Sequence, residues 1–110
     1  MIVVRRDITA QRAILTLRCE YRGKTIAVNE VLAKETRWYS YYLVWSGKVL
    51  FGLDNASDRE ALRMRYGSDF IHHLQEPIPH LHTEDKQELE LTDEKGFADF
   101  VEMVLELGGT

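Results

Sequence analysis

Hydrophobic and polar residues alternate along the first half of the chain. From Ala13 to Tyr21 an apolar side chain occupies nearly every second position, which is the period of a half-buried β-strand. The run from Thr25 to Ala33 is rich in β-branched residues, and the turn Gly23-Lys24 separates the two segments. We therefore expect two consecutive antiparallel strands joined by a tight turn.

The strongest strand pattern is aromatic. Residues 38–45 read Trp-Tyr-Ser-Tyr-Tyr-Leu-Val-Trp and contain no proline or glycine, and such aromatic and branched side chains fit a pleated sheet surface. The turn Ser46-Gly47-Lys48 leads into the apolar run Val49–Leu53. These residues predict a hairpin, and the short connections predict an antiparallel meander.

The pattern changes after this hairpin. Asn55 or Ser57 is expected to cap a short helix over residues 58–63, and residues 88–91 suit one more short strand. Near the C-terminus, Thr92 is expected to cap a helix. Its apolar residues recur at helical spacing: Phe97, Phe100, Val101, Val104 and Leu105. The chain therefore predicts an α+β fold, an antiparallel meander of about four to five strands packed by the C-terminal helix.

Composition fits one domain over residues 1–110, because 45% of the residues are apolar and such a share builds one core. The single cysteine, Cys19, excludes an internal disulfide. Charges interrupt each apolar stretch before it reaches the length of a signal peptide or a membrane span. We therefore expect a cytoplasmic protein that does not bind membranes. The chain contains no glycine-rich phosphate loop and no serine nucleophile motif.

Charge divides the chain into a basic and an acidic half. Residues 1–48 carry nine Lys/Arg and four Asp/Glu, a balance of +5, whereas residues 49–110 carry five and fourteen, a balance of −9. The overall acidity argues against a general nucleic-acid coat but permits a local phosphate site. Arg37 is a candidate phosphate contact in the aromatic hairpin, and Tyr41 is a candidate for base stacking.

The four histidines lie within eleven residues, at His72, His73, His80 and His82. His80 and His82 are the better pair, because residues i and i+2 of an extended segment point the same way. Two imidazoles on one face can divide between acid and base roles, or bind a metal together with a nearby acid such as Glu84 or Asp85. Asp54, at the end of the aromatic hairpin, either orients an imidazole, coordinates a metal or caps the turn.

Three stretches resemble the TumE-like toxins of type II toxin–antitoxin systems. They are Tyr39–Leu43, the strand and turn Lys48–Ala56, and Pro79-His80-Leu81-His82. The resemblance implies a growth-inhibiting toxin that a cognate antitoxin protein neutralises. It marks Asp54, Asn55, His80 and His82 as motif positions.

This chain departs from the family pattern after the Asp-Asn-Ala turn. Histidines commonly follow that turn in the family, whereas this chain has Ser57-Asp58-Arg59. The missing histidines favour a non-enzymatic protein-binding module as the alternative function.

The sequence thus predicts a toxin that acts on RNA. His80 and His82 are expected to share acid and base roles in phosphodiester cleavage, with Asp54 orienting one of them. No metal or cofactor belongs to this expected mechanism.

Three further residues, Arg37, Tyr41 and Asn55, are expected to contact the substrate. The expected partners are the antitoxin, RNA and a second copy of the chain in a homodimer. Two alternatives stay open. One is a non-enzymatic module that binds a protein partner. The other is a small metal-binding domain that uses His80, His82 and a nearby acid.

Overall fold

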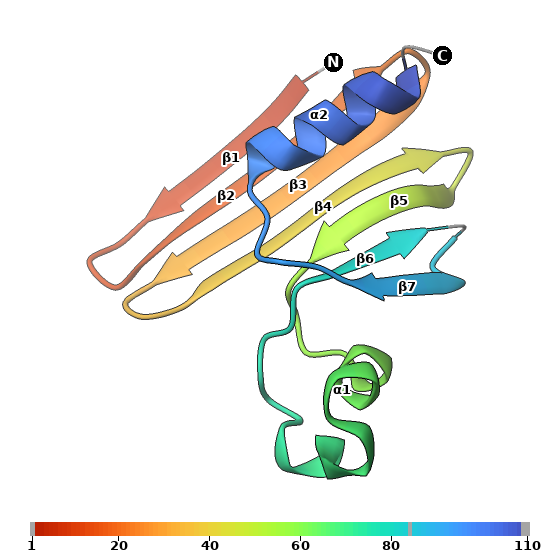
Figure 1. Ribbon diagram of the computed structural model, residues 1–110. Coiled ribbons are helices and arrows are strands. Elements are labelled where there is room, and N and C mark those ends of the chain that lie inside the picture. Colours follow the sequence, from red (N-terminus) through yellow and green to blue (C-terminus); the bar gives the residue numbers. More distant parts are fainter. Residues whose placement is uncertain (1, 84, 109–110) are drawn as a thin grey trace.

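The computed structural model describes residues 2–83 and 85–108. A seven-stranded antiparallel sheet forms its centre, and each strand pairs with the next one in sequence. Figure 1 shows this meander with the C-terminal helix lying across one face. The predicted α+β class and antiparallel meander are confirmed, but the sheet has seven strands where about four to five were expected.

The strands and helices have the following bounds in chain order. They are β1 (Ile2–Ile8), β2 (Arg12–Tyr21), β3 (Lys24–Ala33), β4 (Arg37–Trp45), β5 (Lys48–Asp54), α1 (Arg59–Tyr66), the 3₁₀ helix η1 (Gly67–His72), β6 (His80–Thr83), β7 (Glu88–Leu91) and α2 (Phe97–Gly108). The sequence pattern did not predict β1 and β6.

These two strands were missed for different physical reasons. β1 lies at an edge of the sheet and all seven of its residues are exposed, so its sequence shows no alternation between a buried and a solvated face. β6 has four residues, His-Leu-His-Thr, and lies between β5 and β7. Backbone pairing on both sides makes it a strand, whereas its own β-propensity is weak.

Helix starts also differ from the predicted caps. Asp58 caps α1, because its carboxylate accepts a hydrogen bond from the Ala61 backbone N–H. α2 begins at Phe97 and not directly after Thr92, and the Gly96 N–H donates to the Asp99 carboxylate at 2.8 Å. Within the described part of the chain, no helix combines the length and apolar character that a bilayer crossing requires.

The larger apolar core lies between the sheet and α2. Its buried residues are Val28, Tyr39, Tyr41, Leu43, Phe51 and Leu53 from the strands, with Phe100 and Val104 from α2. The predicted apolar stripe of α2 is thus buried at Phe100 and Val104, while Phe97 and Leu105 at its margins are exposed. The helix stripe and the aromatic strand bury each other, as their periods predicted.

A smaller core lies on the opposite face of the sheet, at its β5–β7 end. Ala61 and Leu62 of α1 pack there with Ile78, and Leu89 and Leu91 of β7 lie against them. Strand side chains alternate between the two faces of a sheet. The residues of β4, β5 and β6 that do not face α2 therefore point to the side of the sheet that α1 covers.

Candidate functional site: a histidine–aspartate cluster

Asp54, His80 and His82 come together on the α1 side of the sheet. β5 and β6 pair with Asp54 opposite His80 and with Gly52 opposite His82. The two-residue period of the strands turns both imidazoles to the face that carries Asp54. One ligand atom from each of the three side chains lies within 4.8 Å of the others. The three residues proposed as one site from the sequence thus meet in space, and their chemical roles stay a prediction.

The two imidazoles are in direct contact. His80 Nε2 and His82 Nε2 are 3.1 Å apart, and the rings meet edge to face. His80 Nδ1 lies 2.6 Å from the carbonyl oxygen of Ile78, and a carbonyl accepts but cannot donate. His80 therefore carries its proton on Nδ1 and presents the lone pair of Nε2 to the cluster.

His82 is buried and has unused bonding capacity. Its exposed fraction is 8%, against 1% for His80, and its Nδ1 has no hydrogen-bond partner among the described residues. Burial, together with His80 and Lys86, lowers the pKa of His82, although Asp58 and Asp54 oppose the shift. His82 is therefore neutral near pH 7, which is the state of an imidazole that binds metals.

Asp54 is held at both carboxylate oxygens. The Tyr42 hydroxyl donates to Oδ2 at 2.8 Å, and the Ala56 N–H donates to Oδ1 at 2.7 Å. Burial and the Asp54 carboxylate raise the pKa of Tyr42, so this phenol stays protonated and acts as a donor. The Tyr42 ring also stacks beside His82, with ring centroids 6.4 Å apart.

Solvent reaches the cluster from the side of Asp54. A groove of about 260 Å³ opens there between β3, β4 and the end of β5. It is lined by Asn29, Val31, Trp38, Tyr39, Ser40, Asp54, Asn55 and Ala56. The carboxylate is thus the member of the cluster that borders this groove.

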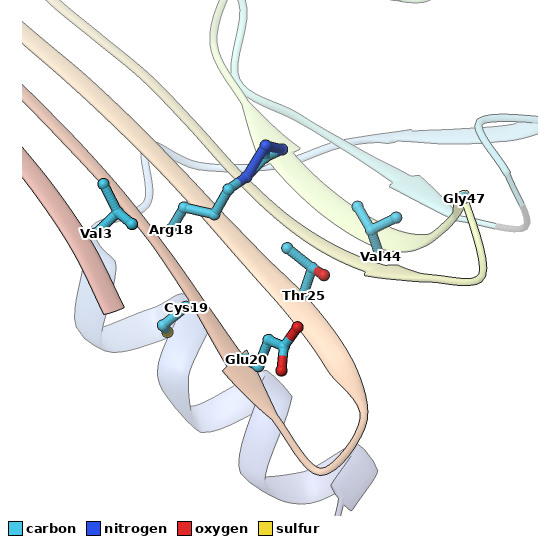
Figure 2. Close-up of a pocket in the computed structure, with 7 residues that line it drawn as sticks. All are labelled: Val3, Arg18, Cys19, Glu20, Thr25, Val44 and Gly47. Atoms are coloured by element: carbon cyan, nitrogen blue, oxygen red, sulfur yellow. The ribbon is translucent and has the colours of Figure 1, made fainter. Parts of the chain in front are cut away.

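A second hollow, of about 410 Å³, lies farther along the sheet (Figure 2). Its lining comes from β1 to β4 and the β4–β5 turn: Val3, Arg18, Cys19, Glu20, Thr25, Val44 and Gly47. Arg18 and Glu20 give it charges of both signs, and none of the cluster residues lines it.

Two of the predicted substrate contacts, Arg37 and Tyr41, lie on the α2 side of the sheet. The Arg37 guanidinium donates to Glu94 at 3.0 Å, to Glu30 at 3.2 Å and to the Tyr41 hydroxyl at 2.7 Å. Tyr41 is fully buried, and its hydroxyl donates to Glu30. Both side chains therefore hold the scaffold on the face opposite the histidines.

The third predicted contact, Asn55, is also occupied by the scaffold. Its side-chain oxygen accepts from the Tyr39 N–H at 2.8 Å, and its amide nitrogen donates to the Arg37 carbonyl at 2.7 Å. Asn55 is 4% exposed. It ties the end of β5 to the start of β4 and so fixes the position of the neighbouring Asp54.

The other histidines lie outside the cluster. His73 stacks on Tyr66 with ring centroids 3.7 Å apart and contacts Glu76 at 2.7 Å, while His72 is exposed. Glu84, one of the acids considered for a metal site, lies outside the described residues. The other, Asp85, accepts a hydrogen bond from the Val49 N–H at 3.2 Å.

Sequence reasoning missed Tyr42 and Lys86. The sequence named Tyr41 and not Tyr42; adjacent strand residues point to opposite faces, and the sequence does not show which face carries the histidines. Only the pairing of Tyr42 with Gly52, and of Gly52 with His82, places Tyr42 in the cluster. Lys86 lies with its ammonium 4.8 Å from the Tyr42 ring centroid, a contact that no local pattern indicates.

The site is therefore defined by its geometry: two buried imidazoles in contact, a carboxylate beside a groove, and a tyrosine and a lysine around them. No protein-family model, no curated protein and no solved structure matches the chain.

Proposed function

We propose that Asp54, His80 and His82 bind a divalent transition-metal ion. The observation that carries this proposal is the 3.1 Å separation of the two Nε2 atoms, with a carboxylate in the same cluster. Metal–imidazole bonds are about 2.1 Å long, so two nitrogens at this separation subtend about 95° at a shared ion. Such an angle suits neighbouring ligands of a five- or six-coordinate ion.

The donor set indicates which metals fit. Two imidazole nitrogens and one carboxylate favour Zn²⁺, Fe²⁺, Co²⁺ or Ni²⁺ over Mg²⁺ and Ca²⁺, which prefer oxygen ligands. The Ile78 carbonyl orients His80, and Tyr42 orients Asp54, as outer partners of metal ligands commonly do. Three protein ligands leave positions for water, and a bound ion lowers the pKa of such water enough for hydrolysis near neutral pH.

Direct metal titration tests this proposal. Protein stripped of metal is titrated with CoCl₂ and with ZnCl₂, and binding is followed by calorimetry and by the visible absorption of Co²⁺. We expect one ion per chain, and Asp54→Asn or His82→Gln should weaken binding on the order of 100-fold or more.

The matched control is His72→Gln, which removes an exposed imidazole outside the cluster and should leave the affinity unchanged. A wild-type protein that binds neither ion would refute the site. Equal affinities for the wild type and the Asp54→Asn and His82→Gln variants would place bound metal elsewhere.

A second candidate function is cleavage of RNA by the same cluster without metal, in a toxin that a cognate antitoxin neutralises in the cytoplasm. The resemblance to TumE-like toxins suggests it, and Lys86 supports it. The ammonium lies 4.8 Å from the Tyr42 ring centroid and contributes to the lowered pKa of His82. A cation beside the histidines suits a phosphate group and disfavours a bound metal ion.

Incubation of cellular RNA with the protein, with and without EDTA, separates the two candidates. Cleavage that persists in EDTA and is lost in His82→Gln would favour the metal-free reaction. Cleavage that requires added metal would assign the activity to the metal site. If RNA stays intact under both conditions, RNA is not the substrate, and the metal titration still decides the first candidate.

A further inference from the structure

β1 forms one edge of the sheet, and no other described strand pairs with its outer side. It is the first strand of the sheet and pairs with β2 in an unbroken register from Ile2–Cys19 to Ile8–Ala13. All seven residues are exposed, and Ile2 and Ile8 are each 70% exposed. Edge strands are commonly protected by being short, by bulges, by a covering element, by proline or by charged side chains. Among the described residues β1 has only the last of these, at Arg5, Arg6 and Asp7.

The hydrogen bond at the β1–β2 turn shows which backbone groups of β1 have no partner among the described residues. The Thr9 N–H donates to the Arg12 carbonyl at 2.8 Å. Backbone groups alternate in direction along a strand, so the odd-numbered residues of β1 point their N–H and C=O groups at β2. The even-numbered residues point theirs outward from the sheet: Ile2, Val4, Arg6 and Ile8.

We propose that β1 pairs with β1 of a second copy of this chain, antiparallel, about a two-fold axis at Arg6. In this register the outward groups of Val4 meet those of Ile8 in the other copy, and Arg6 meets its own counterpart. Both partners of each such pair are even-numbered, so their free backbone groups can exchange hydrogen bonds. The two sheets then form one continuous sheet.

Charge complementarity selects this register. Arg5 of each copy lies opposite Asp7 of the other, at the positions without backbone hydrogen bonds, where opposed side chains are closest. A two-fold axis at Arg5 would instead place Arg5 opposite Arg5 of the other copy at one of these close positions. An axis at Asp7 would likewise place the two Asp7 side chains opposite each other. The one like-charge contact in the proposed register is Arg6 with its counterpart, at a wider hydrogen-bonded position, and two opposite-charge pairs flank it.

Self-pairing also covers the apolar side chains of the edge. Val4 pairs with Leu17, which packs against the core under α2, so Val4 and Ile8 point to the α2 side of the sheet. In the dimer, Val4 of each copy would lie against Ile8 of the other. The α2 side also has an apolar hollow of about 190 Å³ near this edge, lined by Ile2, Leu17 and Phe97 among others. This interface is independent of the metal site, because β1 and the β5–β6 pair lie in different parts of the sheet (Figure 1).

Sedimentation equilibrium of the full chain tests self-pairing. The wild type should be a dimer that dissociates on dilution. Val4→Pro removes an outward N–H that the monomer does not use, and proline is tolerated at such edge positions. This variant should be monomeric with an unchanged circular dichroism spectrum. Val4→Thr, which keeps the N–H, is its control and should stay dimeric.

Charge variants test the register. Arg5→Asp alone and Asp7→Arg alone should each raise the dimer Kd on the order of 10- to 30-fold, because both cross-strand pairs become repulsive. An equimolar mixture of the two variants should regain wild-type affinity as a heterodimer, in which each pair again joins an acid with a base.

Three outcomes would overturn the proposal. The first is a wild type that stays monomeric at all soluble concentrations, which would leave this edge to a strand of another protein. The second is a dimer that Val4→Pro does not weaken. The third is a mixture of the charge variants that associates no better than either variant alone.

Discussion

Replacing Phe100 with alanine is expected to lower the free energy of unfolding by about 3–5 kcal/mol. Phe100 is fully buried, and its ring lies 5.7 Å from that of Tyr41 and 5.6 Å from that of Phe51, centroid to centroid. The substitution removes this aromatic contact and leaves a cavity between α2 and the sheet. Because Phe100 is the largest α2 side chain in this core, its loss should weaken the packing of the whole helix.

Urea denaturation followed by circular dichroism measures this loss. The matched control is Phe97→Ala, which removes the same side chain one turn earlier in α2 at a position that is 43% exposed. We expect a loss less than half as large for the control. Similar losses for the two variants would show that α2 is not anchored chiefly through Phe100.

The second large effect is expected for Gly52→Ala, with a loss of about 1–3 kcal/mol from overpacking. The Tyr42 ring lies across Gly52 from the neighbouring strand, and a Cβ at position 52 would overlap Cδ1 and Cε1 of that ring. The backbone of Gly52 is not in the left-handed region, so glycine is needed for space and not for conformational freedom. Displacement of Tyr42 also removes the donor that orients Asp54.

Gly52→Ala should therefore weaken Co²⁺ binding together with stability, on the order of 10-fold or more for the affinity. Tyr42→Phe separates the two effects, because it keeps the ring and removes the hydroxyl. It should weaken Co²⁺ binding and change the stability less.

A double-mutant cycle identifies the cause of the lost stability. In a Tyr42→Ala background the ring is absent, so the added methyl group at position 52 should cost little stability. An equal cost of Gly52→Ala in both backgrounds would rule out the clash with Tyr42 as its cause.

Several features of the fold follow from local patterns. The period of two in residues 13–21 and the aromatic run at 38–45 predicted strands that the structure contains, and the spacing of Phe100 and Val104 predicted the buried face of α2. These signals are readable because each element buries one face, so burial imposes a period on its own sequence. β1 and β6 show no such periodic pattern, because β1 buries neither face and β6 is too short to display a period.

The candidate site was likewise predictable from the sequence only in part. That His80 and His82 share a face needs no more than an extended backbone, and the sequence predicted it. Their contact with Asp54 requires a particular register between β5 and β6. These two strands are separated along the sequence by α1 and η1. The sequence suggested Arg37 and Tyr41 as substrate contacts, yet both are bonded within the scaffold on the other face, whereas Tyr42 adjoins the histidines.

Local chemistry along the chain was thus sufficient to indicate the class of fold, the hairpins, the helix stripe and the paired histidines. The register between strands, and the face of the sheet to which each side chain points, are known only from the tertiary structure. A shift of one residue in register turns every side chain of a strand to the opposite face, and register depends on backbone pairing between segments far apart in sequence. For this reason the meeting of Asp54, Tyr42 and the two imidazoles is a property of the folded sheet, and so is the open edge at β1.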